Sequence, residues 1–84
     1  MATQIRTNGE RSEVVGANAG KLTLSQLQTA VGGFAEVVRL DAQRLLVVNE
    51  EGLLLALDLN KDATRLARRT IVGDVLLCDA SEVE

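Results

Sequence analysis

The order of apolar and polar positions along the chain predicts several short strands. Short apolar segments bounded by Gly, Asn, Asp or Gln predict strands at 12–16, 34–40, 44–49 and 71–78. A fifth apolar run occupies 53–57 and contains no polar side chain. Such a run fits either a strand or a helix. The glycine before it and its closeness to the preceding strand favour a third strand of a meander.

Two short helices are predicted between these strands. Thr23 and Gln26 have the spacing of a capping box. In this motif the Thr23 side chain accepts from the backbone N–H of Gln26, and the Gln26 side chain reaches back to the backbone N–H of Thr23. The first helix therefore begins after Thr23, and Gly32-Gly33 ends it, because glycine adopts a left-handed backbone without steric cost. Asn60 is a good N-cap for a second helix. This helix is expected to continue past Ala67, with Arg68 and Arg69 near its end.

The resulting order is strand, helix, strand, strand, strand, helix, strand. It indicates an α+β fold, with a small, largely antiparallel β-sheet and two short helices packed on one face. At 84 residues the chain has room for a single domain. We expect residues 22–78 to form its core, with polar, flexible ends at 1–11 and 79–84.

Composition and charge narrow the function classes. The chain has no His and one Cys, so His-based catalysis, a disulfide framework and a Cys/His zinc site are excluded. We expect no enzyme activity, no cofactor and no metal. The chain has nine basic and twelve acidic side chains, whereas nucleic-acid binders usually have a basic surplus that neutralises phosphates. We therefore do not expect it to bind nucleic acid. No apolar run is long enough to cross a membrane or to act as a signal peptide, so we expect a cytoplasmic protein. Cys78, in an apolar run, is expected to be a buried thiol.

One basic cluster is a candidate anion site. Arg65, Arg68 and Arg69 are three and four residues apart and share a face of the second predicted helix. Forked guanidinium groups suit phosphate recognition, although a solvated helix end would explain them equally. Asn60 and Thr64, one turn apart at the start of the same helix, fit either capping or the same anion site.

A second candidate is the polar loop of Asn49, Glu50 and Glu51 before Gly52. It could present carboxylates to a cation or to a ligand amine, or it could be an ordinary hairpin turn. Gly32-Gly33 ends a helix, whereas phosphate-binding loops precede one, so this pair is interpreted as a helix cap.

The apolar strands also predict self-association. The 44–49 strand is apolar on both faces, and the leucines of 53–57 repeat this pattern. Two short helices on one face would leave the other face bare, and monomers rarely expose a large apolar patch. We therefore expect a homo-oligomer, most simply a two-fold dimer, with Leu46, Val48 and Leu54 at its interface.

Four segments in order resemble the bacterial, phage and plasmid family catalogued as domain of unknown function 3846. They are Leu24-Ser25-Gln26-Leu27-Gln28 with Val31-Gly32-Gly33 and Glu36-Val37-Val38, then Val47-Val48-Asn49-Glu50-Glu51-Gly52, then Asn60 with Ala63-Thr64, and finally Ile71-Val72-Gly73-Asp74-Val75. The chain departs from the family pattern at Phe34, where a Tyr is common, and at Leu59, where a Pro is common.

The resemblance implies a small protein or domain of phages and mobile elements, and it supplies no catalytic residue. We expect a small non-enzymatic counter-defence protein that binds and sequesters a host factor, either a nucleotide-type signal or a host protein. The alternative is a structural adaptor that assembles through its sheet. The counter-defence role rests only on the genomic setting that the resemblance implies.

Overall fold

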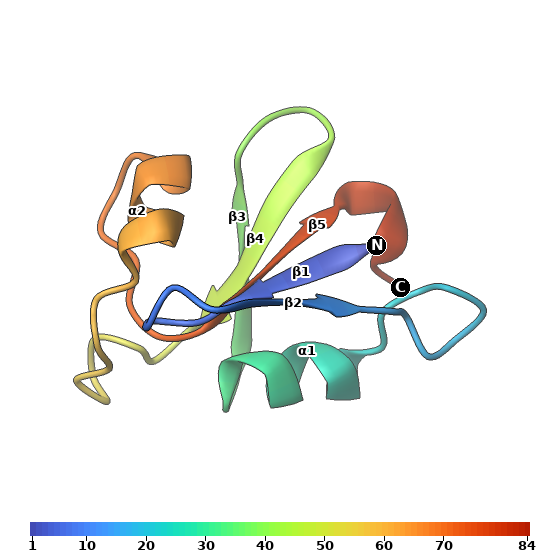
Figure 1. The fold of residues 1–84 in the computed structure, drawn as a ribbon. Helices are drawn as coiled ribbons and strands as arrows, with labels where there is room; N and C mark the ends of the chain where they lie inside the picture. Colours follow the sequence, from blue (N-terminus) through green and yellow to red (C-terminus); the bar gives the residue numbers. More distant parts are fainter.

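The computed structural model describes residues 1–84 and has five strands, two α-helices and one short 3₁₀ helix (Figure 1). In chain order the elements are β1 (Ala2–Ile5), β2 (Arg11–Val14), α1 (Leu24–Val31), β3 (Ala35–Arg39), β4 (Arg44–Asn49), α2 (Lys61–Ala67), β5 (Val75–Asp79) and η1 (Ala80–Glu82). The strands form one sheet in the order β2-β1-β5-β4-β3, and every neighbouring pair is antiparallel. The predicted α+β class is confirmed.

The ends of the two helices follow the side chains that predicted them. Thr23 Oγ1 accepts from the backbone N–H of Gln26 at 3.2 Å, and Gln26 Oε1 accepts from the Thr23 N–H at 3.1 Å. Gly32, at φ 77°, ends α1 in the left-handed conformation. Asn60 caps α2, as expected. That helix ends at Ala67, because Arg68 itself takes the left-handed conformation at φ 55°.

The two faces of the sheet carry separate apolar clusters. Alternate residues of a strand point to opposite faces. On one face Leu45 and Val47 of β4 join a cluster with Leu27 and Val31 of α1. On the other face Leu46 and Val48 join a cluster that contains Ala63 of α2. The two helices therefore lie on opposite faces, not on one face as the sequence suggested (Figure 1).

This arrangement corrects the expected oligomer interface. Leu46 is 0% exposed and Val48 is 5% exposed within the single chain. Because α2 covers the face that was expected to be bare, neither side chain offers surface to a partner. Leu54, the third residue of the expected interface, is exposed.

The leucine-rich segment 53–57 is not a strand. Residues 50–56 form consecutive turns, closed by backbone hydrogen bonds from Leu55 N–H to Glu51 O at 2.8 Å and from Leu57 N–H to Gly52 O at 3.0 Å. Both edges of β4 are already occupied, by β3 and by β5. A third meander strand following β4 therefore has no place beside it, and the sequence-based assignment was wrong here.

The two ends of the chain are not loose. β1 lies between β2 and β5 in the sheet, with Ala2 and Ile5 both 0% exposed. The last residues form η1 and a parallel bridge between Leu22 and Val83. The expectation of flexible ends at 1–11 and 79–84 fails, because short polar strands gain their order from neighbours that are far away in the sequence.

Two strand boundaries also differ from the prediction. The strand expected at 12–16 is β2, which ends at Val14. The strand expected at 71–78 begins only at Val75, because Val72 instead forms an isolated bridge with Leu59 and Gly73 turns the chain at φ 81°. This turn brings residues 73–74 beside the segment 57–58.

Candidate functional site

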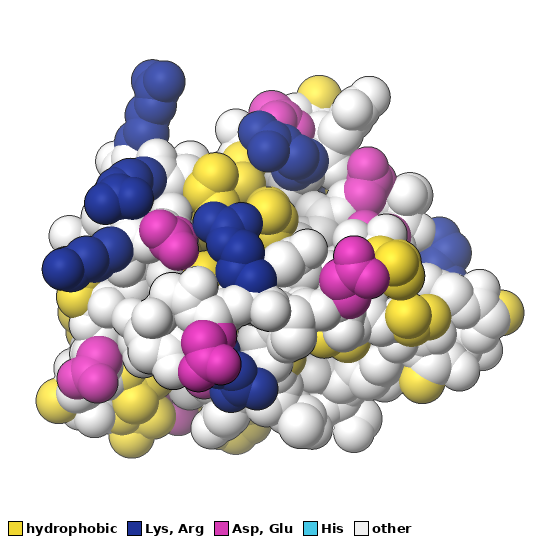
Figure 2. Space-filling view, in the orientation of Figure 1, with side chains coloured by type: hydrophobic (Ala, Val, Ile, Leu, Met, Phe, Trp, Pro, Cys, Tyr) yellow, Lys and Arg dark blue, Asp and Glu magenta, His cyan; other side chains and the backbone are white.

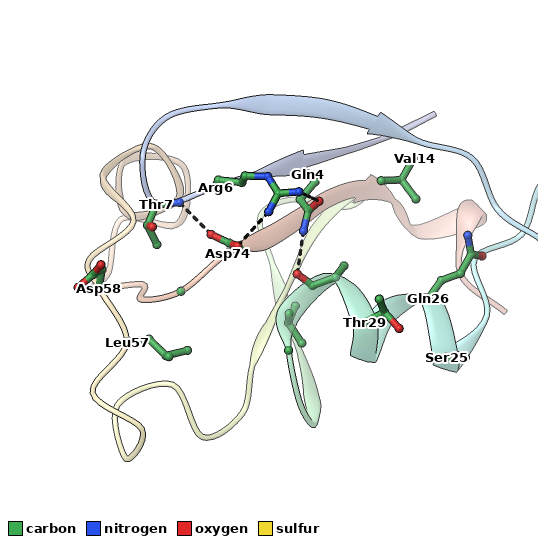
Figure 3. A pocket seen from close by; sticks show the side chains of 14 residues that line it. Gln4, Arg6, Thr7, Val14, Ser25, Gln26, Thr29, Leu57, Asp58 and Asp74 are labelled. Atoms are coloured by element: carbon green, nitrogen blue, oxygen red, sulfur yellow. Dashed lines mark hydrogen bonds and ion pairs between the residues drawn. The ribbon is translucent and has the colours of Figure 1, made fainter.

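A groove of about 640 Å³ opens beside α1, on the face of the sheet that this helix covers (Figure 3). One side is formed by α1, the other by the end of β1 and the segment after it, and one end by the two segments 57–58 and 73–74. Its lining residues are Gln4, Arg6, Thr7, Val14, Ser25, Gln26, Thr29, Ala30, Val31, Gly32, Leu57, Asp58, Gly73 and Asp74.

The position of α1 on the sheet creates this groove. The helix packs through Leu27 and Val31 against the cluster over β4 and β5. Its neighbouring face carries small or polar side chains, among them Ser25 and Thr29, and it faces β1 and β2 across open space. One hydrogen bond crosses the base of this gap, from Gln4 Nε2 to the carbonyl of Ala30 at 2.8 Å.

A network of charged and polar groups holds Arg6 in the wall of the groove. Arg6 Nη2 donates to Gln4 Oε1 at 3.2 Å, and Arg6 Nη1 lies 3.5 Å from Asp74 Oδ2. The other carboxylate oxygen of Asp74 accepts from the backbone N–H of Thr7 at 3.0 Å. The Arg6 side chain remains 48% exposed. The guanidinium is thus oriented by its neighbours while still open to a ligand.

Other polar groups of the groove are not used by the fold. The side chains of Ser25, Thr29 and Asp58 make no hydrogen bond or ion pair within the chain. Ser25 and Thr29 lie on α1, and Asp58 lies at the end of the groove formed by 57–58 and 73–74 (Figure 3). Gln26, by contrast, is fully engaged, because its side chain bonds to Ala17, Thr23 and Val15. The groove therefore offers one oriented cation, one carboxylate without an ion pair and the three hydroxyls of Thr7, Ser25 and Thr29.

The structure gives Asn60 and Thr64 structural roles. Asn60 is 1% exposed, and its Nδ2 donates to the carbonyls of Ile5 at 3.0 Å and Gly73 at 2.9 Å. Its Oδ1 accepts from the Ala63 N–H at 3.1 Å. Thr64 Oγ1 bonds to both backbone groups of Ile71. Every polar atom of the Asn60 amide is thus occupied within the chain, which leaves capping as the role that the structure supports.

The three arginines that were expected to form an anion site do not converge. Arg65 lies 3.5 Å from Asp62 and lines a small hollow with Arg6, Lys61 and residues 7–9. Arg69 lines a different hollow, beside Glu50 and Leu54. Arg68 lies between them at the left-handed end of the helix and lines none of the described hollows. Acidic side chains lie among the basic ones on this side of the molecule (Figure 2).

The polar loop after β4 is a turn with a buried anchor. Asn49 is 6% exposed, and its Nδ2 donates to the last carbonyl of α1, that of Val31, at 3.0 Å. Its Oδ1 accepts from the Glu51 N–H at 2.8 Å. Glu50 and Glu51 are exposed. Asn49 therefore joins β4 to α1, and this geometry supports a structural turn over a cation site. The turn is not that of a hairpin, because no strand follows it.

Sequence reasoning missed the groove because its residues come from five separate segments. Arg6 and Asp74 are far apart in the chain, and neither belongs to a motif. A weak signal was present in β1, where polar Gln4 and Arg6 alternate with the apolar Ile5. No group of three or more His, Cys, Asp or Glu side chains is placed to hold a metal ion. No helix is long and apolar enough to cross a membrane.

The fold and the groove define a small α+β domain in which a helix and the end of an interior strand enclose a polar hollow. The chain belongs to the family described as domain of unknown function (DUF3846), whose model matches residues 4–84. This confirms the resemblance and extends it from 22–78 to nearly the whole chain, including the end of β1 and Arg6. No curated protein and no solved structure shows a significant match to this chain.

Proposed function

We propose that the protein is a non-catalytic binding module that captures a small nucleotide-type ligand in the groove beside α1. The observation that carries the proposal is the oriented but half-exposed guanidinium of Arg6, in a groove whose Ser25, Thr29 and Asp58 side chains have no partner in the chain. Ligand pockets are hollows of roughly 300–1,000 Å³ in which a few placed polar groups set specificity. At about 640 Å³ the groove lies within that range.

The charges of the groove favour a ligand with both acceptor and donor groups. A guanidinium binds phosphate or carboxylate through parallel N–H bonds. The exposed carboxylate of Asp58, which has no ion pair in the chain, can accept from the opposite kind of group, a hydroxyl or amino donor. A nucleotide carries a phosphate and sugar hydroxyls on one small molecule, so it offers a partner to both groups. The expected anion binding is therefore assigned to Arg6 rather than to the three arginines at the end of α2.

Sequestration fits this groove better than catalysis. A hydroxyl nucleophile needs a base within hydrogen-bonding distance, and neither Ser25 nor Thr29 bonds to one. Asp74 is occupied by Arg6 and by the backbone of Thr7. We therefore propose stoichiometric binding of a host signal in the host cytoplasm, as a counter-defence protein of a phage or mobile element.

Titration calorimetry with adenosine monophosphate, a cyclic dinucleotide and inorganic phosphate tests this proposal. We expect at least one nucleotide to bind, and to bind more tightly than phosphate, because phosphate alone leaves Asp58 and most of the hydroxyls unused. Arg6→Ala should weaken that binding about tenfold or more, the effect of one lost charge-assisted bond. Thr29→Val, which preserves side-chain shape, should weaken it less.

Arg69→Ala is the matched control, because Arg69 is exposed and lies outside the groove. It should retain the wild-type affinity. If no nucleotide binds, or if Arg69→Ala loses binding while Arg6→Ala retains it, the groove is not the ligand site. Native mass spectrometry of protein purified from host lysate gives an independent measurement, since a retained ligand adds its mass to the 9.0 kDa chain.

A structural adaptor remains the second candidate, and one observation favours it. Leu53 and Leu54 are 78% and 81% exposed, in the turns that follow β4. Exposed apolar runs of this kind are typical of interaction surfaces. The two candidates predict different losses, because a leucine substitution should abolish adaptor binding and leave nucleotide affinity unchanged.

A further inference from the structure

The turns after β4 expose the most apolar surface of the molecule. Leu53, Leu54 and Leu55 are 78%, 81% and 53% exposed, and Phe34 is 61% exposed. Leu55 and Phe34 line the same hollow. Hydrophobic side chains gather at this corner of the molecule, at the lower left over the loop that follows β4 (Figures 1 and 2). We name these four side chains the leucine surface.

The backbone holds the leucine surface outward. Gly52 is buried, and its N–H donates to the carbonyl of Asn49 at 3.1 Å. Further along, the Ala56 N–H donates to Leu53 O at 3.1 Å, and Ala56 has a left-handed φ of 54°. A segment closed by its own hydrogen bonds cannot turn three leucines into the core without breaking them. The backbone hydrogen bonds of the turn therefore keep these leucines exposed.

The area of this surface matches the largest apolar patch that a monomer usually exposes, and such patches are often functional. Four large apolar side chains at these exposures present on the order of 500 Å² of apolar surface, within the range of the largest patch on a typical monomer. The smaller specific protein interfaces bury roughly 600 Å² on each partner. The leucine surface and its polar rim together supply an interface of that size.

The same surface contains both a projection and a hollow. Leu53 and Leu54 project, while a hollow of about 500 Å³ lies between α1 and Leu55. The hollow is lined by Ser25, Gln28, Thr29, Gly32, Gly33, Phe34, Glu51 and Leu55. In a two-fold contact each copy uses the same patch, so the leucines of one copy meet the hollow of the other.

The rim carries charges of both signs. Glu50, Glu51 and Arg69 lie around Leu53 and Leu54 in the adjoining hollow. None of the three makes an ion pair within the chain. A two-fold axis through the leucine surface therefore allows Arg69 of one copy to face the glutamates of the other.

We infer that the leucine surface is the contact between two copies of this chain in a two-fold dimer. This replaces the interface expected from the sequence and retains Leu54 from it, and its evidence does not rest on the proposed ligand. The contact borders the groove, because Ser25, Thr29 and Gly32 line both the hollow and the groove.

Sedimentation velocity at increasing protein concentration measures the assembly state directly. The wild type should sediment at twice the 9.0 kDa mass of one chain at micromolar concentration. Leu54→Glu should sediment as a monomer with an unchanged far-ultraviolet spectrum, because a side chain that is 81% exposed contributes little to the fold. Val15→Glu is the control, since Val15 is 62% exposed outside the leucine surface, and it should remain dimeric.

A charge exchange tests the orientation of the two copies. Arg69→Glu should weaken the dimer, and Arg69→Glu combined with Glu51→Arg should restore it. A wild type that stays monomeric throughout the range would overturn the inference and leave the surface to a different protein. A dimer that survives Leu54→Glu would overturn it as well, because the contact would then lie elsewhere.

Discussion

The side-chain amide of Asn60 donates to the carbonyl of Ile5 at 3.0 Å and so joins the start of α2 to the end of β1. A second N–H of the same amide donates to the carbonyl of Gly73 at 2.9 Å. One buried residue thereby connects three segments that surround one end of the groove. The positions of Arg6, directly after Ile5, and of Asp74, directly after Gly73, both depend on this residue.

Asn60→Ala should lower the free energy of unfolding by about 2–4 kcal/mol, since two buried carbonyls and a helix N-cap lose their partner. Asn60→Asp retains the oxygen that caps α2, but it places a carboxylate oxygen where the amide nitrogen donated to two carbonyls. It should therefore also destabilise the protein. Urea unfolding gives the comparison. Asn18→Ala, at an exposed asparagine, should change the free energy by less than about 0.5 kcal/mol. Equal losses at both asparagines would contradict the role of Asn60.

Gly16 should not tolerate a side chain. A Cβ at this position would lie 2.2 Å from the carbonyl carbon of Lys21 and 2.4 Å from that of Gly20, and these backbone atoms cannot move aside as a side chain could. Gly16→Ala is expected to cost about 3 kcal/mol, the upper end of the usual cost of overpacking, because it also disrupts the local bridge. Gly20→Ala meets open space and carries only the cost of its left-handed φ of 85°, about 1 kcal/mol. Thermal unfolding of both variants should therefore show a larger loss at Gly16.

Cys78 should react slowly with thiol reagents in the folded protein. Burial, with smaller contributions from the charges of Glu82 and Asp79, raises the pKa of the Cys78 thiol from 9.0 to about 11. At pH 8 a disulfide reagent should label Cys78 only as fast as the protein opens, and immediately in urea. The unfolded chain loses this proton first, so stability should fall as pH rises from about 9 to 11. Cys78→Ala should lack that fall.

The loss of stability at acidic pH should depend on Asp41, in the turn before β4, and on Asp79, at the end of β5. Hydrogen bonds from the backbone of Arg44 and Gln43 lower the pKa of Asp41, and those from the N–H and hydroxyl of Ser81 lower the pKa of Asp79. A lowered carboxyl pKa contributes stability above the unfolded value of 3.8 that is lost as pH falls through the folded value. Asp41→Ala with Asp79→Ala should therefore flatten the pH dependence of unfolding below pH 3.8. An unchanged loss of stability at acidic pH would show that these hydrogen bonds do not persist in solution.

Local signals in the sequence predicted the elements they control. Thr23, Gln26 and Gly32 act through neighbours within one turn of α1, and the helix begins and ends where they place it. The apolar positions of 44–49 likewise predicted β4 with both its boundaries. These features depend on contacts between residues close in the sequence, so the pattern alone was sufficient.

Features that depend on distant contacts could not be predicted in this way. Ala2-Thr3-Gln4-Ile5 has little apolar character, and it becomes a strand only because β5 and β2 pair with it on both sides. The leucines of 53–55 have strong apolar character, yet they are exposed because β4 has no free edge. The groove has the same origin, since Arg6 and Asp74 meet only after β1 has paired with β5.

The pairing of Ile5 with Val75 means that the sheet cannot be completed until almost the whole chain has been synthesised. β5 lies between β1 and β4, so the sheet stays in two pieces until β5 has left the ribosome. A β1–β2 hairpin by itself is at most marginally stable in water. During synthesis the nascent chain therefore carries bare strand edges on β1 and β4, and it closes them in a late step whose rate is limited by long-range pairing. Chains that stall before β5 should aggregate or be degraded rather than accumulate as partly folded protein.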